Sequence, residues 1–374
     1  MADIFLYGTL RHAALLDVVA GGETQLVAAQ LSGFATYWAK GEAFPLITRE
    51  DGGVAQGMLL RGASDEMRAR LDFYERPFGY ALHPVEVSVD GTPVPALVYL
   101  PDADAPWQAG AHFDLAQWQA QSGQWAVLAA QEIMRLFGQV TDAELRHRFA
   151  VIGARAQSRL RAEALVTPPR IGSGLSARDV EVTDTDFVHD GFFTLQETQL
   201  RYRRFDGSNS QTHSRMVLRA GDAVTVLPYD PIRDRVLLIE QFRHAVFAHG
   251  DPHPWLLEPV AGINDAGESY EQTARREAME EAGVTLSDLH YVGRYYPTPG
   301  VLAQVLISYV GLADLPDDLA GLGGLAEEGE DIQGHILPFA TFAEMLEADE
   351  LRVAPLVLSA HWLVAHRDRL RGQS

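Results

Sequence analysis

The sequence predicts an α+β protein built from two domains. Its 374 residues exceed what a single hydrophobic core usually organises. Strand-like segments dominate roughly the first hundred residues, a helical stretch follows, and strands and helices return in the second half. A segment rich in proline and glycine separates the halves. We therefore expect domains at 1–165 and 179–374, joined by a linker at 166–178.

Composition narrows the class of protein. The chain has 30 basic and 51 acidic residues, a formal net charge of -21, which disfavours a nucleic-acid partner because duplex binding relies on Lys and Arg. It has no cysteine, which excludes disulfides, thiolate-zinc sites and cysteine nucleophiles. No apolar run approaches the roughly eighteen residues of a membrane span, and the N-terminus does not resemble a secretory signal. We expect a soluble cytoplasmic protein without a membrane partner.

The first half contains strands followed by helices. The segments DIFLYGTL, GVAQGMLLRG and HPVEVSVDGTPVPALVYL are β-branched or aromatic runs broken by Gly, Pro and Asp-Gly turns, as expected for strands. From Trp107 to about Ala164, apolar residues recur at helical spacing, for example at Trp125, Leu128 and Ile133. This periodic stripe predicts packed helices.

The linker and the second half follow. In VTPPRIGSGLSARD, from Val166 to Asp179, Pro-Pro and Gly-Ser-Gly prevent a continuous helix or strand. Strands are then predicted at DAVTVLPYD, RVLLIEQFR and LISYVGL, and helices at 270–282, 342–348 and 356–370.

The most informative segment is GINDAGESYEQTARREAMEEAGV, Gly262 to Val284. Glu277, Glu280 and Glu281 share one helix face, where like charges cost about 0.2–0.5 kcal/mol per pair. A divalent cation reverses this cost, because converging carboxylate oxygens are ligands that Mg²⁺ prefers. The alternative is that these glutamates are exposed and paired with Arg275 or Arg276, and Arg276 lies four residues before Glu280.

The spacing of this segment resembles the Nudix box: Gly262, Glu268, Arg276-Glu277, Glu280-Glu281 and Gly283. LIEQFRHAVF, PWLLEPVAGI and GLAEEGEDI are similar to the ADP-ribose pyrophosphatase branch of that family, over about 179–370. The resemblance implies an α/β/α sandwich with a mixed sheet, and Mg²⁺ as cofactor with Mn²⁺ as the alternative. It implies metal ligation by Glu277, Glu281, Glu280 and the carbonyl of Ala261, and a structural Glu268–Arg276 ion pair.

The same resemblance assigns the remaining roles in this half. A proton acceptor is implied at Glu328, with Glu330 next. Substrate contacts are implied at Arg243, at Phe192 or Phe193, and at Arg215, which would act across a homodimer; Met216 then stands where relatives carry a polar residue. The implied substrate is a small nucleoside diphosphate compound, and the implied reaction is hydrolysis of ADP-ribose to AMP and ribose 5-phosphate.

A second resemblance concerns the first half. FLYGTLR is a strand running into a glycine turn, where successive backbone amides can hold an anion, and LDFYE ends at Glu75. Together they resemble the gamma-glutamylcyclotransferase-like family over about 3–100. That family implies a small β-barrel with helices, substrate binding by Tyr7, Gly8, Thr9 and Leu10, and Glu75 as the acid/base. The family often has Tyr-x-Arg after the glutamate, whereas Tyr80 is followed here by Ala81-Leu82.

Three interpretations of the whole chain remain open. The first is a Nudix pyrophosphatase with a second, cyclotransferase-like activity, a layout similar to proteins labelled as tellurite-resistance proteins. The second is a sensor that binds a nucleotide sugar without turnover, which the intact set of glutamates argues against. The third keeps the Nudix enzyme and makes the first half a non-catalytic interaction module.

Overall fold

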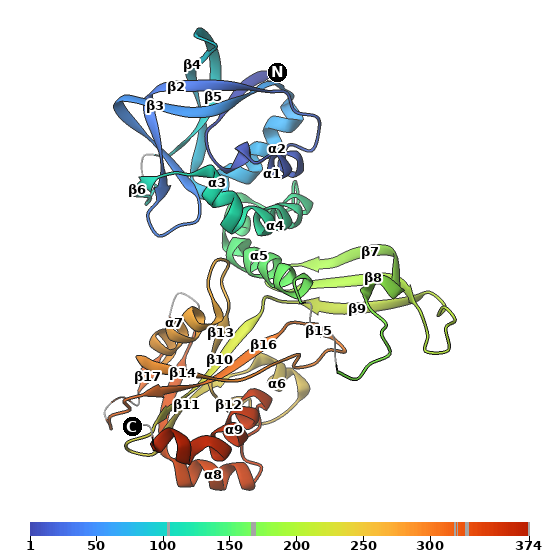
Figure 1. The fold of residues 1–374 in the computed structure, drawn as a ribbon, viewed down its shortest axis with the longest axis vertical. Coiled ribbons are helices and arrows are strands. Elements are labelled where there is room, and N and C mark those ends of the chain that lie inside the picture. Colours follow the sequence, from blue (N-terminus) through green and yellow to red (C-terminus); the bar gives the residue numbers. More distant parts are fainter. Residues whose placement is uncertain (103–104, 166–169, 318, 320, 326–328, 373–374) are drawn as a thin grey trace. The chain divides into compact units, whose positions relative to one another are not determined.

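The computed structural model describes residues 1–102, 105–165, 170–317, 319, 321–325 and 329–372. The chain divides into two compact units (Figure 1). The N-terminal unit is Met1–Pro168 with Asp190–Phe192, and the C-terminal unit is Pro169–His189 with Phe193–Ser374. The linker expected at 166–178 begins in residues that the structure does not describe, so its bounds stay a prediction. Within the described part of the chain, no helix is both long and apolar enough to cross a membrane.

A curled six-stranded sheet forms the first layer of the N-terminal unit. Its strands run in the order β3-β1-β5-β4-β2-β6, where β1 is Ala2–Leu6, β2 is Leu26–Ala39, β3 is Pro45–Ala63, β4 is Tyr80–Val89, β5 is Thr92–Pro101 and β6 is Ala109–His112. Because β2 also pairs with β3, the pairings form a ring, but β2 and β4 are paired through a single residue couple, Gln30–Ser88. The expected small barrel is therefore an incompletely paired, curled sheet.

Helices form the second layer of this unit. They are α1 (Ala13–Ala20), α2 (Asp65–Glu75), α3 (Leu115–Trp118), α4 (Gln124–Arg135) and α5 (Asp142–Glu163). The last three lie in the stretch where the sequence predicts helices. Leu16, Leu71, Ile133 and Leu145 are almost completely buried between these helices and the sheet. The apolar stripe of the sequence is therefore the helical side of a core.

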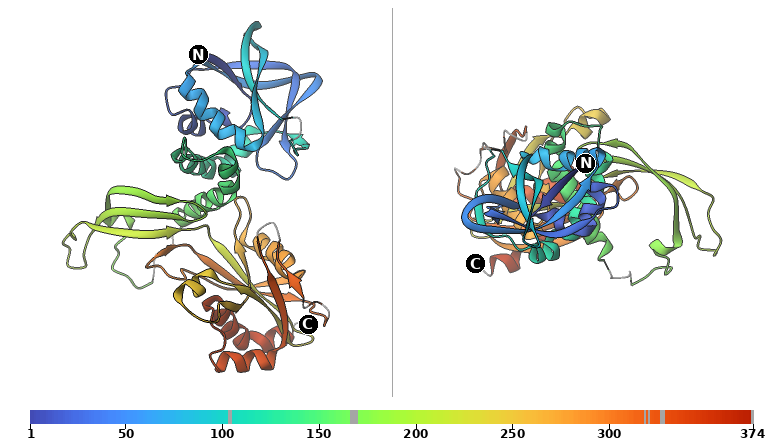
Figure 2. Two further views of the ribbon diagram at one scale, coloured as in Figure 1. Left: turned by 180° about the vertical axis from the view of Figure 1, so that it is seen from behind. Right: turned by 90° about the horizontal axis from the view of Figure 1, so that it is seen from above.

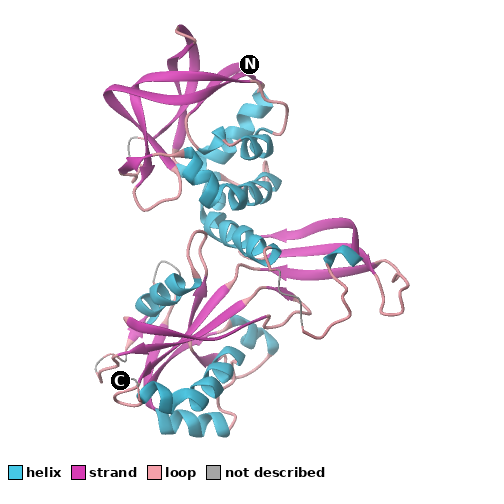
Figure 3. Ribbon diagram, in the orientation of Figure 1, coloured by secondary structure: helices cyan, strands magenta, loops and turns pink. Residues whose placement is uncertain are grey.

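An eight-stranded mixed sheet lies at the centre of the C-terminal unit (Figure 3). The strands are β10 (Ala223–Asp230), β11 (Arg235–Phe242), β12 (Trp255–Glu258), β13 (Val260–Ile263), β14 (Leu286–Tyr295), β16 (Leu306–Ala313), β17 (Leu322–Gly323) and β18 (Ile332–Pro338). β10 pairs in parallel with β16 and antiparallel with β11 and β13.

Helices cover both faces of this sheet, as alternation along β10 requires. Val224 and Val226 pack with Ala274 and Ala278 of α7 (Tyr270–Ala282) on one face. Tyr229 packs on the other face, against α8 (Phe339–Glu347) and α9 (Ala354–Arg371). The predicted α/β/α sandwich with a mixed sheet is confirmed.

A smaller sheet precedes the sandwich in the same unit and projects from it in both views (Figure 2). Its order is β15-β9-β8-β7, with β7 at Val180–Asp190, β8 at Thr194–Tyr202, β9 at His213–Arg219 and β15 at Leu302–Ala303. β7 lies at an edge and is exposed along almost its whole length. Large apolar side chains are exposed on this sheet, at Val180, Val182, Val188, Tyr202 and Met216.

Candidate active sites

Helix α7 is held at both ends by local sequence. Its N-cap residue, Ser269, accepts a hydrogen bond from the Gln272 N–H at 3.2 Å, and the Gln272 side chain accepts one from the Ser269 N–H at 2.8 Å. This reciprocal capping box satisfies two otherwise unpaired donors. Gly283 ends the helix in the left-handed conformation at φ 64°, which glycine adopts without a steric cost. The caps fix where the glutamates of the helix lie along the sheet.

Glycine is required where β13 passes under α7. A Cβ atom built on Gly262 would overlap the carboxyl end of Glu277. The absence of a side chain lets the Glu277 carboxylate lie directly against the strand backbone. The Gly262 of the predicted box therefore has a steric reason.

Arg276 joins the acidic residues of the loop and the helix. Its Nε and Nη2 donate to the two Glu268 oxygens at 3.0 and 3.1 Å, so the predicted ion pair is present. Its Nη1 also donates to Glu277 at 2.7 Å and to Glu280 at 2.9 Å, so the alternative pairing expected for Glu280 is present as well. Burial alone would lower the pKa of Arg276, but these carboxylates raise it overall.

Glu281 lies on the buried side of α7, with 3% of its surface exposed. The Ala261 N–H donates to its Oε2 at 2.9 Å, which connects the helix to β13. Burial raises the pKa of Glu281 to about 8; the Ala261 hydrogen bond lowers it, and nearby Glu277 and Glu330 raise it further. Arg243 also lowers this pKa, but burial outweighs it, so the surroundings favour the protonated form of Glu281.

Arg243 and Glu258 form a second charged pair beside this cluster. Arg243 donates to both Glu258 oxygens, at 2.7 Å from Nε and 2.5 Å from Nη2. The pairing with Glu258 raises the pKa of Arg243, and Glu281 and Glu330 add to the rise. Glu258 is a buried acid that sequence reasoning missed; a lone Glu in the apolar segment PWLLEPVAGI was the available signal.

The acidic loop after β17 approaches the end of α7. A Cβ on Gly323 would overlap the Glu281 carbonyl oxygen, and the Gly324 N–H lies 3.4 Å from the Glu280 carbonyl oxygen. Glu330 accepts a hydrogen bond from the Leu325 N–H at 3.1 Å and is close enough to act electrostatically on Glu281 and Arg243. Glu328, the first candidate for proton acceptor, lies outside the described residues.

The donor set suits a hard divalent cation. Carboxylates of Glu277, Glu280 and Glu281 and the Ala261 carbonyl are all oxygen ligands, the type that Mg²⁺ and Mn²⁺ take. In the described part of the chain, no three acidic or histidine side chains are arranged as a ready metal site. Arg276 occupies oxygens of Glu277 and Glu280, so these side chains must turn from the arginine to reach a cation. A cation in this place would favour the charged form of Glu281, whose pKa burial raises.

The predicted nucleotide contacts lie on or next to the smaller sheet. Arg215 is exposed on β9 and donates to the Ser214 carbonyl at 2.9 Å. Phe192 and Phe193 lie between β7 and β8 and are 54% and 42% exposed. Their accessibility is compatible with ligand contact, and their roles stay predictions.

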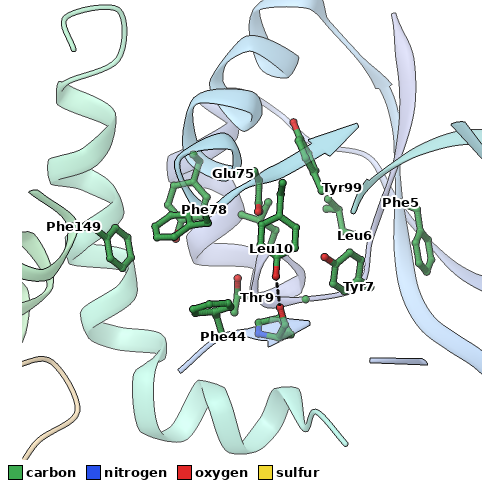
Figure 4. Close-up of a pocket in the computed structure, with 14 residues that line it drawn as sticks. Phe5, Leu6, Tyr7, Thr9, Leu10, Phe44, Glu75, Phe78, Tyr99 and Phe149 are labelled. Carbon is green, nitrogen blue, oxygen red and sulfur yellow. Dashed lines mark hydrogen bonds between the residues drawn. The ribbon is translucent and has the colours of Figure 1, made fainter. Parts of the chain in front are cut away.

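A cavity of about 90 Å³ in the N-terminal unit brings together the other predicted residues (Figure 4). Tyr7, Gly8, Thr9 and Leu10 lie on one part of its wall, and Glu75 faces them from the end of α2. In Figure 4 the Glu75 carboxyl and the Tyr7 and Thr9 hydroxyls are directed toward the middle. Gly8 is constrained here, because a Cβ would come within 2.6 Å of Pro45 Cγ.

Aromatic side chains complete the cavity wall and were not singled out from the sequence. Tyr74, Tyr80 and Tyr99 surround Glu75, with Phe44, Phe78 and Phe149 nearby. Burial in this environment raises the pKa of Glu75 from 4.5 to about 7. Burial also raises the pKa of Tyr7, and Tyr80 and Glu75 add to that rise. A carboxyl group that titrates near neutrality can exchange protons in either direction.

Two family models match the chain, one in each unit. Residues 4–126 match the model of the gamma-glutamyl cyclotransferase, AIG2-like family, and residues 219–356 match the NUDIX domain model. The first match contains Tyr7–Leu10 and Glu75, and the second contains the whole carboxylate cluster of α7.

Several known proteins are similar to about half of the chain. An ADP-ribose pyrophosphatase of Escherichia coli is 34% identical over 209 residues, which are 56% of this chain and 99% of that protein. An ADP-ribose pyrophosphatase of Haemophilus influenzae is 33% identical over 50% of this chain and 87% of its own length. A GDP-mannose pyrophosphatase of Escherichia coli is 30% identical over 50% of this chain and 95% of its own length. A solved structure described as an ADP compounds hydrolase aligns at a TM-score of 0.40 with 22% identity, covering 54% of this chain and 99% of that one.

Proposed function

Because the chain belongs to the Nudix hydrolase family and also carries an AIG2-like gamma-glutamyl cyclotransferase domain, we propose that its C-terminal unit hydrolyses the pyrophosphate bond of ADP-ribose. The products are AMP and ribose 5-phosphate. The observation that carries this proposal is the cluster of Glu277, Glu280 and Glu281 on α7, held against Gly262 of β13. Two relatives named as ADP-ribose pyrophosphatases, similar to this half of the chain, support the choice of substrate.

Each residue of the cluster has a defined part in the proposed reaction. Glu277, Glu281, Glu280 and the Ala261 carbonyl would hold Mg²⁺, for which Mn²⁺ can substitute. When bound, the cation neutralises phosphoryl charge and lowers the pKa of the attacking water. Arg243, which is oriented by both oxygens of Glu258, would bind a phosphate oxygen. The acidic loop supplies the proton acceptor for the water, at Glu328 or at Glu330.

A product-release assay tests the proposal. The full chain is given ADP-ribose, GDP-mannose and other nucleoside diphosphate sugars, with Mg²⁺, with Mn²⁺ and with a chelator. We expect AMP from ADP-ribose only with a cation, and loss of at least about a hundredfold in Glu281→Gln, in line with the loss of a group that acts in the transition state. Glu271→Gln, an exposed acid of the same helix, is the matched control.

Each other outcome of this assay has a defined meaning. If the chain hydrolyses a different sugar nucleotide instead, the pyrophosphatase function holds but ADP-ribose is not its substrate. Binding of ADP-ribose without turnover of any compound, in protein that binds Mg²⁺, contradicts the proposal in favour of a nucleotide-sugar sensor.

The N-terminal cavity favours a second function. We propose that it converts gamma-glutamyl compounds to 5-oxoproline, because Glu75 and the Tyr7–Leu10 segment line one cavity and Glu75 titrates near neutrality. Glu75 would accept a proton from the α-amine as this nitrogen attacks the γ-carbonyl carbon. Release of 5-oxoproline from gamma-glutamyl amides by the full chain, abolished in Glu75→Gln, supports this function. Absence of release from every amide supports a non-catalytic interaction module instead.

A homodimer through the smaller sheet is also part of the proposal. Strand β7 lies at the edge of the smaller sheet, and Val180, Val182 and Val188 are 41%, 56% and 51% exposed on it. Light scattering after gel filtration should give twice the chain mass, and Val182→Glu should reduce it to one chain. A single-chain mass for the parent protein contradicts this part of the proposal.

The proposed setting of the enzyme is the cytoplasm, where nucleotide substrates and divalent cations are available. We propose no nucleic-acid partner, because a net charge of -21 repels polyphosphate over most of a surface. A membrane partner is likewise no part of the proposal.

A further inference from the structure

Three phenylalanine side chains lie at one side of the N-terminal cavity, and we call them the aromatic rim: Phe44, Phe78 and Phe149. The rings of Phe78 and Phe149 are edge to face at 4.5 Å between centroids, and those of Phe44 and Phe78 are tilted at 6.3 Å. Figure 4 shows the rim residues on the side of the cavity away from Tyr7 and Tyr99. Trp107 packs on one member of the rim, edge to face with Phe44 at 5.0 Å between centroids.

Helix α5 holds the rim and the segment that follows Glu75. Asp142 pairs with Arg76 at 3.1 Å, the Arg146 Nε donates to the Pro77 carbonyl, and Phe149 packs on Phe78. Positions 142, 146 and 149 are spaced i, i+4 and i+7, so one face of α5 makes all three contacts. Phe149 lies beyond residues 4–126, where the cyclotransferase family model matches. The rim therefore depends on a helix that this match does not include.

The chemistry of the cavity wall selects against charged ligands on the rim side. Among the described residues that line the cavity, Glu75 is the only one with a charged side chain; the others are aromatic, aliphatic, Gly, Pro or Thr. A carboxylate placed against the rim would lose its hydration without gaining a cation. An apolar group placed there is favoured, because it covers apolar surface of three rings.

We propose that the N-terminal site acts on gamma-glutamyl amides of apolar, aromatic-bearing amines, with Phe149 as the residue that determines this specificity. This inference rests on the cyclotransferase function proposed above. The gamma-glutamyl group occupies the inner cavity beside Glu75 and Tyr7, and the amine substituent packs on the aromatic rim.

The reaction balances without any further reactant. The α-amine nitrogen forms a bond to the γ-carbonyl carbon, and the bond from that carbon to the leaving nitrogen breaks. Glu75 takes the proton released by the attacking amine and returns it to the leaving amine. The products are 5-oxoproline and the free amine.

A series of amides that differ only in the leaving amine tests the specificity. The full chain is given the gamma-glutamyl derivatives of methylamine, benzylamine, glycine and 1,2-diaminoethane, and 5-oxoproline is measured from each. We expect kcat/KM for the benzylamide to exceed that for the methylamide by about tenfold or more, the range expected for an apolar substituent in a pocket. The glycine and diaminoethane derivatives, which carry a charge at the rim, should be the poorest.

Substitutions at the rim separate specificity from folding. Phe149→Ala should lower kcat/KM for the benzylamide by about tenfold and leave the methylamide value within about twofold. Phe149→Leu, which keeps an apolar side chain, should restore most of the difference. Phe113→Leu is the matched control, because its ring packs on Trp38 and does not line the cavity.

The outcomes that overturn the inference differ from those that overturn the function. Equal kcat/KM across the series, a preference for the glycine or diaminoethane derivative, or the same loss for every amide in Phe149→Ala would overturn the specificity while 5-oxoproline release still supports the cyclotransferase. No 5-oxoproline from any derivative would overturn both.

Discussion

Glu75 and Glu281 are carboxylates whose pKa values burial raises, and their different neighbours suit the different roles proposed for them. Glu281 lies near Glu277 and Glu330, which raise its pKa further. A bound cation would offset the repulsion between these carboxylates. Glu75 is surrounded by tyrosine and phenylalanine side chains, and no other charged side chain is among the described residues that line its cavity. A carboxyl group in such surroundings is suited to accept and donate a proton. The same physical shift thus supports metal binding at one residue and proton transfer at the other.

A pH profile tests the use of Glu75. Burial raises its pKa from 4.5 to about 7, so its base form is scarce below neutrality. The kcat/KM for 5-oxoproline release should therefore rise about tenfold per pH unit below pH 7 and level off above it. A profile already level at pH 5 would show that Glu75 ionises as an ordinary surface acid.

The pH dependence of protein stability tests the raised pKa of Glu75 independently of activity. A raised pKa in the folded state means that Glu75 favours folding below pH 4.5 and that this contribution is lost as pH rises through 7. Glu75→Gln, which stays uncharged, should therefore raise the unfolding temperature more at pH 8 than at pH 5.

Gly262 provides a steric test of the carboxylate cluster. In Gly262→Ala the new Cβ overlaps the Glu277 carboxyl group and must displace it. We expect the affinity for the activating cation, measured by titrating Mg²⁺ in the AMP-release assay, to fall about 10–100-fold, the usual range for disturbing the support of a metal ligand. Gly293→Ala is the control, since its Cβ meets side chains only at 3.9 Å or more. Unchanged cation dependence in Gly262→Ala would remove Glu277 from the ligand set.

At the scale of elements, α7 was predictable because its signals are local. The box from Gly262 to Gly283 lies in one short segment, and the helix observed at Tyr270–Ala282 agrees with the prediction. Three strands of the sandwich, β10, β11 and β16, were likewise predicted from their apolar runs. The incomplete ring of the N-terminal sheet was not, because the single Gln30–Ser88 pair between β2 and β4 depends on long-range register.

The cap of α7 provides a test at this scale. Ser269→Ala removes the acceptor for the Gln272 N–H and should destabilise the C-terminal unit by about 1 kcal/mol in denaturant unfolding. Ser269→Thr keeps a hydroxyl and should lose clearly less. Equal losses in both variants would mean that packing on the sheet, rather than the cap, fixes the start of the helix.

The site residues that sequence reasoning missed come from distant elements. Phe44 precedes β3, Phe78 follows α2 and Phe149 lies on α5, and only the tertiary fold brings their rings together. Glu258 was missed for the same reason. Its pairing with Arg243 depends on β12 lying beside β11 in the folded sheet. Motif spacing predicts residues that act within one segment, and it carries no information about such convergence.

At the scale of the whole molecule, each unit has its own hydrophobic cores and its own candidate site. The clusters around Leu16 and Phe5 contain residues of the N-terminal unit only, and those around Ile239 and Phe342 contain residues of the C-terminal unit only. Each candidate site is therefore stabilised by the hydrophobic cores of its own unit. Separate cores predict activities that can be removed one at a time.

Single substitutions in the full chain test this independence. Glu75→Gln should abolish 5-oxoproline release and leave AMP release within about twofold, Glu281→Gln should do the reverse, and the double variant should lose both activities. A ligand of one site should also leave the affinity of the other unchanged, since allosteric coupling requires a state that both ligands bias. Allosteric coupling typically changes an affinity by about fivefold or more. A change of that size at one site, caused by a ligand or a substitution at the other, would mean that the two units share a conformational equilibrium. In that case the fusion would work as a regulated pair rather than as two enzymes on one chain.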